Sequence, residues 1–177
     1  MSLTMKATFF LTALLLASIA EPALASFAIF MKVDGITGDS ANDKYTGDFD
    51  VQAVSSGVSL PDGAVKAQFA DLSVLIHLSR GTPNLLVAAA QGTHIATVEI
   101  DFANGSNTMT FYKIVLSDVL ISGIKETGAI DTTNAVPTDL VTFRYSKIEW
   151  TYTTITPAGA AGGTTSGGWD LTKNTKS

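Results

Sequence analysis

One short helix signal, set between two β segments, most constrains the fold of this chain. The signal lies within the stretch from Asp71 to Phe102. Thr82 can accept hydrogen bonds from the first free amides of the helix, Pro83 suits its first position, and Gly92 supplies a left-handed exit. The apolar stripe of the helix comprises Leu85, Leu86, Ala88 and Ala89. The remainder of the chain after its first 25 residues has the pattern of strands and turns, which predicts a mainly β protein with one helical insertion.

Turn signals divide the β segments. Residues 27–33 predict an apolar strand that ends at the turn dipeptide Asp34-Gly35. Residues 49–58 predict a second strand, whose small residues indicate a bulge or the close approach of another backbone. Residues 95–102 and 109–122 predict an antiparallel hairpin, because Asn104-Gly105 between them favours a tight turn. Several long apolar strands favour a barrel, since an open sheet would leave long edges free to pair.

The last long strand changes its alternation near Ser146-Lys147. Before this point the residues of one face are Val141, Phe143 and Tyr145, and after it Ile148, Trp150 and Tyr152 have the opposite parity. A one-residue slip in a period-two pattern predicts a bulge and a strongly bent strand. Residues 157–168 are rich in Gly, Ala, Ser and Thr and predict a flexible loop. Trp169 then predicts an anchor for a closing strand over residues 170–175.

The first residues predict a secretory leader. Lys6 provides a basic start, residues 7–20 form an apolar run, and the small residues of Ala23-Leu24-Ala25 precede Ser26. A membrane anchor is the alternative, but the run is shorter than the ~20 apolar residues that cross a bilayer, and Glu21-Pro22 interrupts it. We therefore expect a signal peptide over residues 1–25, a single domain over residues 26–177, and no association with membrane after cleavage of the leader.

Composition excludes several classes of function. The net charge of −5 and the pI near 4.8 give no electrostatic footprint for nucleic acid. The chain has no cysteine, so disulfides, thiolate nucleophiles and thiolate metal ligands are ruled out. An exported protein of this composition must be held by its core or by neighbouring subunits.

No pattern in the chain predicts catalysis. His77 and His94 are its two histidines, and no Gly-x-Ser-x-Gly elbow accompanies them. The acidic residues of one loop region do not have the spacing of an EF-hand calcium loop; they are Asp34, Asp39, Asp43 and Asp48. Carboxylates on strands could supply a glycosidase pair, but the sequence does not set their separation; they are Glu99, Asp101, Asp118, Glu126 and Glu149. We expect no enzyme activity, metal or cofactor.

Five ordered segments together resemble the Hcp family, the haemolysin-coregulated tube proteins of type VI secretion. Besides the region of the helix, the segments are FAIFMKVDGITG (27–38), TFYKIVLSDVLISGI (110–124), LVTFRYSKIEWTY (140–152) and GWDLTKNTK (168–176). The resemblance implies a β-barrel of two antiparallel sheets with one short side helix. It further implies that six copies form a ring, that rings stack into a tube, and that the tube works with sheath, spike and secreted effector proteins.

The resemblance also points to a loop for ring stacking. In the family an extended loop between early strands takes part in stacking, and its position here is residues 59–66. The candidate contact residues are Leu60, Pro61, Asp62, Gly63 and Val65. This segment is shorter than the usual Gly-rich version, which bears on the stability of a tube more than on the formation of a ring.

The leader departs from the family pattern, because tube subunits of this kind usually lack a cleavable signal. The expected location is therefore periplasmic or extracellular. Two other functions stay open at this stage. One is an exported free-standing binding module for carbohydrate or protein, with Tyr112 or Trp150 as contact aromatics and no sheath partner. The other is a secreted hydrolase that uses pairs of carboxylates.

Overall fold

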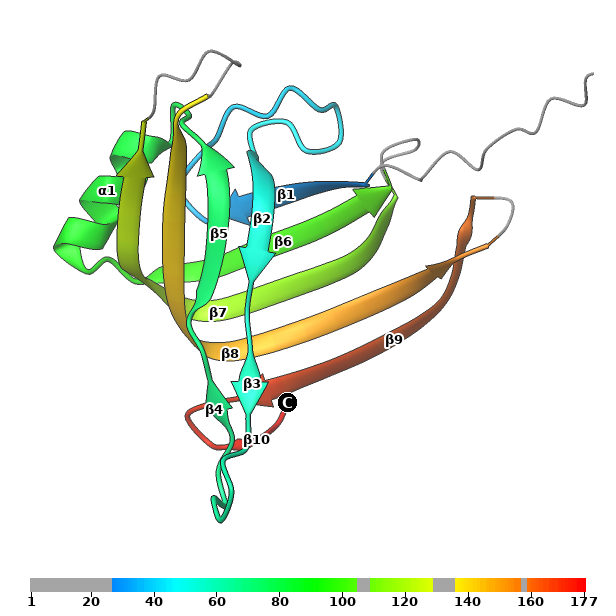
Figure 1. Cartoon of the computed structure of the whole chain (residues 1–177). Coiled ribbons are helices and arrows are strands. Elements are labelled where there is room, and N and C mark those ends of the chain that lie inside the picture. The colour runs from blue at the N-terminus through cyan, green and yellow to red at the C-terminus, as the bar shows by residue number, and fades with distance from the viewer. Residues whose placement is uncertain (1–26, 105–108, 129–135, 157–158) are drawn as a thin grey trace, which may run out of the picture.

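The computed structural model describes residues 27–104, 109–128, 136–156 and 159–177. These residues form one helix and ten strands (Figure 1). The elements are β1 (Phe27–Val33), β2 (Phe49–Ser55), β3 (Val58–Ser59), β4 (Gln68–Phe69), β5 (Leu72–His77), α1 (Thr82–Gln91), β6 (Ile95–Asn104), β7 (Thr110–Thr127), β8 (Thr138–Ile155), β9 (Ala161–Asp170) and β10 (Thr175–Lys176). The predicted leader and the tip of the predicted hairpin at residues 105–108 lie outside the described residues.

Six strands close a barrel. The order β8-β5-β2-β1-β6-β7 is completed by pairing of β7 with β8, and every neighbouring pair is antiparallel. β9 and β10 continue the sheet outward from β8, and α1 lies on the side of the barrel (Figure 1). The predicted mainly β barrel with one side helix is confirmed. The two antiparallel sheets that the resemblance implied are parts of one continuous sheet that closes on itself.

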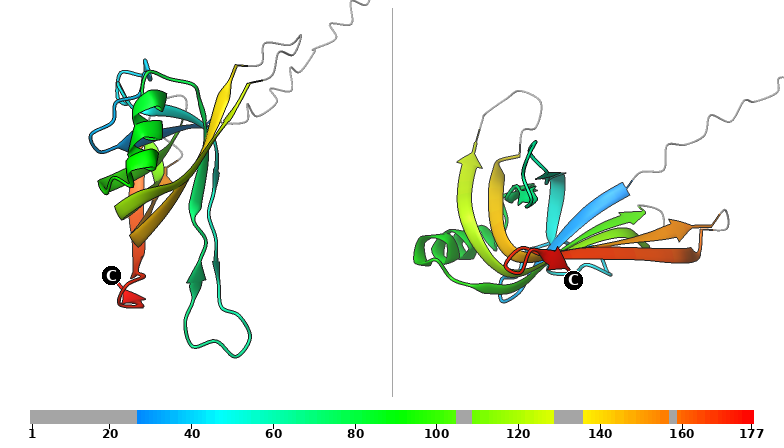
Figure 2. Two further views of the ribbon diagram at one scale, coloured as in Figure 1. Left: turned by 90° about the vertical axis from the view of Figure 1, so that its left-hand side faces the viewer. Right: turned by 90° about the horizontal axis from the view of Figure 1, so that it is seen from below.

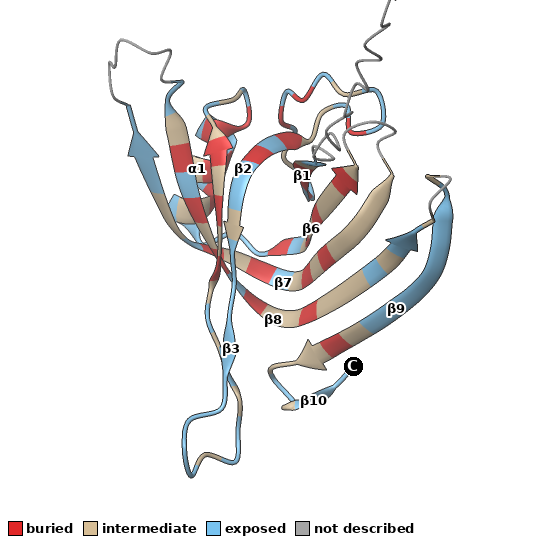
Figure 3. Ribbon diagram, turned by 45° about the vertical axis from the view of Figure 1, so that its right-hand side comes forward, coloured by how far each residue is buried: buried red, intermediate tan, exposed pale blue. Residues whose placement is uncertain are grey.

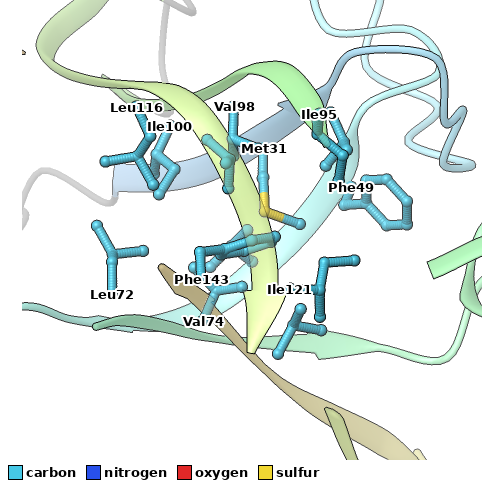
Figure 4. Close-up of a cluster of buried hydrophobic side chains, with 14 of the residues drawn as sticks. Met31, Phe49, Leu72, Val74, Ile95, Val98, Ile100, Leu116, Ile121 and Phe143 are labelled. Carbon is cyan, nitrogen blue, oxygen red and sulfur yellow. The ribbon is translucent and has the colours of Figure 1, made fainter. Parts of the chain in front are cut away.

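The core fills the inside of this barrel with alternate residues of each strand. The burial of β5 alternates strictly, with Leu72, Val74 and Ile76 fully buried. Met31, Phe49 and Phe143 meet them from other strands (Figure 4). Each such side chain contributes about 1.5–3 kcal/mol when it leaves water, so a chain without disulfides can still hold a single domain together.

The start of α1 differs from the prediction. Gly81 occupies the N-cap, and no side chain caps the helix. The hydroxyl of Thr82 instead donates to Oδ2 of the fully buried Asp139 on β8, at 2.7 Å, and accepts from the N–H of Ser79 at 3.1 Å. The predicted cap was therefore wrong, because a buried carboxylate competes for the hydroxyl. The predicted exit is confirmed, since Gly92 has a φ of 62°.

The long strands bend together at one corner of the sheet. On β8 the buried residues Tyr145 and Ile148 are three positions apart, and Leu116 and Val119 on β7 have the same spacing. Ser117 still pairs with Lys147, and Val119 still pairs with Tyr145, so neither strand inserts a residue here. The predicted bend is confirmed (Figure 1), but the predicted bulge was wrong because both strands change face at the same point.

A three-residue hydrogen-bonded group, which we call the corner clamp, lies at this bend. Asp118 on β7 has a φ of 51°, a left-handed conformation that Asp adopts more readily than most residues. Its carboxylate accepts from the Nδ1–H of His94 and from the hydroxyl of Ser146, each at 2.7 Å. These two hydrogen bonds hold the pKa of Asp118 below its usual value, and the bond from Ser146 has the larger effect. The corner clamp therefore ties the beginning of β6 to the bend of β7 and β8.

The C-terminal prediction was wrong in two places. Residues 161–168 form most of β9, although their composition predicted a flexible loop. They are ordered because they pair with β8, and their small side chains do not hinder this pairing. The predicted closing strand at 170–175 is largely a turn. Asp170 accepts there from the backbone N–H groups of Thr172 and Lys173, and hydrogen bonds, that of the Thr172 hydroxyl foremost, lower its pKa to about 2.

We predict that Asp118→Ala lowers the free energy of unfolding at pH 7, because it removes both bonds of the corner clamp and leaves a non-Gly residue at positive φ. The carboxylate of Asp118 stabilises the fold above its unfolded pKa of about 3.9, and this contribution is lost as pH falls through the lower folded pKa. Urea denaturation should therefore show a difference between Asp118→Ala and the unaltered protein that shrinks below pH ~4. An equal difference at pH 3 and pH 7 would contradict this role, and Asp62→Ala on an exposed loop is the matched control.

Candidate assembly surfaces

An arm extends from the barrel where β2 and β5 leave it. β3 continues β2, β4 leads into β5, and the two short strands pair through Val58 with Phe69 and Ser59 with Gln68. The arm projects away from the body of the molecule (Figure 2). All of the predicted stacking residues lie together at its tip, where the N–H of Ala64 donates to the carbonyl of Pro61 and Gly63 has a φ of 73°. Val65 is 98% exposed.

Aromatic packing holds the root of the arm against the sheet. The ring of Phe69 stacks on Trp150 at 6.4 Å and on Trp169 at 6.3 Å between centroids, with interplanar angles of 23° and 26°. The hydroxyl of Tyr145 donates to the carbonyl of Ala70 at 3.1 Å. Trp169 is thus an anchor, as predicted, although it is half-buried and fixes the arm as well as β9. The arm has a fixed root and an exposed apolar tip.

The outer edge of β9 lies open. Among the described residues β10 pairs only with Asp170 and Trp169, so no strand lies beside residues 161–167. These residues are uncharged and mostly exposed (Figure 3). Natural proteins usually protect such an edge with charge, proline or a cover. The sequence did not predict this open edge. Its only signal in the sequence is a run of small residues, and such a run is equally typical of a loop.

Beyond the closed barrel the sheet of β1, β6, β7, β8 and β9 continues as an overhang (Figure 3). One row of paired residues crosses it on the side that faces the core, in the order Phe102, Tyr112, Tyr152, Thr165. Phe27 lies near the row and is 61% exposed, while Tyr152 is 49% exposed. Tyr112 and Trp150, the predicted contact aromatics of a binding module, are half-buried. The signal that could have revealed this row is that the aromatic residues occupy positions on the same face of strands that pair with one another.

The opposite face of the same sheet is polar. Lys113 on β7 lies 2.8 Å from Oε2 of Glu99 and 3.4 Å from Oδ1 of Asp101, both on β6. Burial raises the pKa of Asp101. Burial alone would lower the pKa of Lys113, but the bond to Glu99 and the charge of Asp101 outweigh it and raise this pKa. Lys147 pairs with Glu149 farther along, at 3.1 Å, so this face carries charges of both signs that compensate one another.

The two histidines and the acidic residues that the structure describes do not assemble a reaction centre of a familiar kind. His77 contacts the amide of Gln52, at 2.8 Å from Nε2. Ser146 lies near His94 through Asp118, but its hydroxyl donates to the carboxylate and not to the imidazole, so it lacks the base that activates a serine nucleophile. Within the described ranges no three His, Asp or Glu residues stand close enough to hold a metal ion, and Asp34, Asp39, Asp43 and Asp48 form no such group. No helix among these residues is long and apolar enough to span a membrane.

Comparison with known proteins places the chain in a family. Residues 30–152 match the family model described as "Type VI secretion system effector, Hcp". The chain is 28% identical over 157 residues to Protein hcp1 of Pseudomonas aeruginosa, a match that covers 82% of this chain and 96% of the relative.

Solved structures of similar fold agree. A type six secretion system protein superposes with a TM-score of 0.79 at 24% identity, over 86% of this chain and all of the other. Hcp1 from Salmonella typhimurium superposes with a TM-score of 0.73 at 23% identity, over 85% of this chain and 99% of the other. The match to the family model spans more than half of the chain, and the barrel with its side helix agrees with it. The chain therefore belongs to the Hcp family, the structural tube proteins of type VI secretion systems.

Proposed function

We propose that this protein acts as a ring of six copies, and that the rings stack into a tube through which type VI secretion moves effector proteins. The carrying observation is the open edge of β9 in a member of the Hcp family. A ring joins identical subunits head to tail, so that an edge on each copy meets a different surface on the next and none is left open. No covalent chemistry is needed for this function.

The backbone of β9 is oriented for such a contact. The N–H of Leu171 donates to the carbonyl of Ser146 on β8, whereas the carbonyl of Gly168 accepts from Ser177 on the other side. Successive residues of an antiparallel strand direct their backbone groups to opposite sides. From residue 164 onward the odd-numbered residues of β9 therefore bond to β8, and Ser166 and Thr164 direct their backbone groups to the open edge.

A polar lumen suits the mixed charges around Lys113. In a closed ring one face of the overhang lines the central space, and the face that carries Glu99, Asp101 and Lys113 tolerates water without exposing apolar surface. We assign this face to the lumen and to the passage of a secreted protein. Sheath and spike proteins are the other partners that this function implies.

We predict that Ser166→Pro abolishes the ring while leaving the folded subunit intact, because it removes an outward N–H and none of the bonds to β8. Light scattering of the purified protein should give about six times the subunit mass for the unaltered chain and one subunit mass for the variant. Thr165→Pro is the matched comparison, because it removes a bond to β8 and should also lower the free energy of unfolding by roughly 1–3 kcal/mol.

A monomeric unaltered protein at high concentration would contradict the ring. That result would favour the alternative function, an exported binding module with no sheath partner.

We predict that Leu60→Ser with Val65→Ser shortens or abolishes stacks of rings without breaking the rings. The two side chains are 66% and 98% exposed at the tip of the arm, and burying one such side chain is worth about 1.5–3 kcal/mol, repeated at each subunit of a ring. Negative-stain microscopy would measure the length of the stacks. Val87→Ser on α1, 53% exposed, is the control and should leave stacking unchanged. Stacks of undiminished length in the double variant would remove the arm from this role.

We propose further that residues 1–25 serve as a cleaved leader and that the single domain begins at Ser26. The supporting feature is the basic start and apolar run described above. Mass spectrometry of the protein from an extracytoplasmic fraction should find Ser26 as the first residue. Full-length protein confined to the cytoplasm would contradict export by this route.

A further inference from the structure

Five aromatic rings gather on the core side of the overhang, and we call them the aromatic face: Phe27, Phe102, Phe111, Tyr112 and Tyr152. Three of them belong to the row described above, in which Tyr112 pairs with both Phe102 and Tyr152. The register of β6 and β7 shifts next to Phe102, so that Phe111 is the additional residue of a β-bulge. The ring of Phe111 lies 6.5 Å from that of Phe27 and 6.5 Å from that of Phe102, between centroids. The five rings are therefore one contiguous group.

The aromatic face is uncharged and is exposed at its margins. Side chains alternate between the two faces of a sheet, so Asp101 and Lys113, which pair with each other, lie on the opposite face. Ile29 follows Phe27 on the same face of β1 and is 8% exposed, whereas Phe27 is 61% exposed and Tyr152 is 49% exposed. Burial thus declines where the strands leave the barrel. Contiguous exposed apolar surface of this kind is typical of an interaction site.

The sequence that leads into this face supplies an apolar segment. Residues 7–20 carry no charge and include two phenylalanines and five leucines or isoleucines. Only residues 21–26 separate this run from Phe27, which is itself a member of the aromatic face. Six extended residues span at most about 20 Å. The strands from β1 to β8 lie about 4.8 Å from one another, so the face is about 14 Å wide. Every ring of the aromatic face is therefore within reach of the run.

The covalent link favours a contact within one chain over a contact between chains. A short linker holds a tethered segment at an effective concentration in the millimolar range. Apolar side chains of the run leave water when they pack on the rings, and no charge on either surface opposes this packing. Even a weak contact is therefore well populated as long as the leader stays attached.

We propose that residues 7–20 of the uncleaved chain pack on the aromatic face of the same chain, and that cleavage of the leader uncovers this face. The inference rests on the leader and the ring proposed above, and it adds a control over when the ring forms. Tyr152 pairs with Thr165 of β9, so a segment packed on the aromatic face lies beside the open edge and obstructs the next copy. The subunit therefore stays single until the leader is removed.

Engineered disulfides test the docking, because the chain has no cysteine of its own. The full-length chain, made without signal peptidase, carries Leu15→Cys with either Thr165→Cys or Thr164→Cys. The two threonines are exposed neighbours on β9 that lie on opposite faces of the sheet, since Thr165 pairs with Tyr152 and Thr164 with the next residue of β8. At low protein concentration the chain with Thr165→Cys should form its intramolecular disulfide at least ten-fold faster, as measured by non-reducing electrophoresis and peptide mass spectrometry. Equal rates on the two faces would overturn the docking.

A second pair of chains separates apolar packing from the effect of the tether. Adding Phe9→Ser and Phe10→Ser to both chains shortens no linker but removes two large apolar side chains from the run. The ten-fold preference for Thr165→Cys should then disappear. A preference that persists would show that the tether alone brings Leu15 near β9, and it would equally overturn the docking. Circular dichroism of all four chains should give the same β spectrum, because every change lies in the leader or on an exposed position of β9.

Sedimentation velocity tests the control of assembly. The full-length chain should stay monomeric at a concentration at which the chain that begins at Ser26, which contains every described element, forms rings. Rings formed equally well by both chains would overturn the control of assembly by the leader. If the chain that begins at Ser26 stays monomeric, the ring proposed above is refuted, and the disulfide comparison still decides whether the leader docks.

Discussion

The pairing of β7 with β8 is the contact on which the rest of the structure depends. It runs from Thr127 and Thr138 at one end to Tyr112 and Tyr152 at the other. One half of this pair closes the barrel and covers the core. The other half leaves the barrel and supports the overhang. A single pair of strands therefore provides both the closure of the barrel and the overhang on which the proposed ring depends.

The bend in this pair decides how the two halves are used. At the corner both strands exchange their inner and outer residues without losing register, so an apolar row continues past the barrel. Asp118 makes this possible, because its left-handed backbone conformation is held by bonds from His94 and Ser146. These three residues could pass for pieces of a catalytic triad, but their hydrogen bonds place the carboxylate in the middle. These hydrogen bonds stabilise the bend of the strand pair.

The proposed function follows from surfaces that a lone subunit leaves incomplete. The open edge of β9 and the aromatic rings beside Tyr152 would be liabilities on a monomer, since unpaired edges and apolar patches promote uncontrolled association. In the proposed head-to-tail ring each would become a contact. The mixed charges around Lys113 then remain on the face that meets water. Because this face carries both positive and negative side chains, it is hydrated and does not strongly attract charged molecules of either sign.

Local pattern in the sequence was enough to predict the barrel class, the helix exit at Gly92 and the bend near Ser146, because periodicity and turn chemistry act over a few residues. Tertiary structure alone decided three other features. The hydroxyl of Thr82 bonds to Asp139, which is 57 positions away in the chain. β9 forms because the backbone of β8 pairs with a segment whose own side chains favour no particular secondary structure. The aromatic row exists only because Phe102, Tyr112 and Tyr152 come from three strands, and the register that aligns them is set by long-range pairing, which no local pattern encodes.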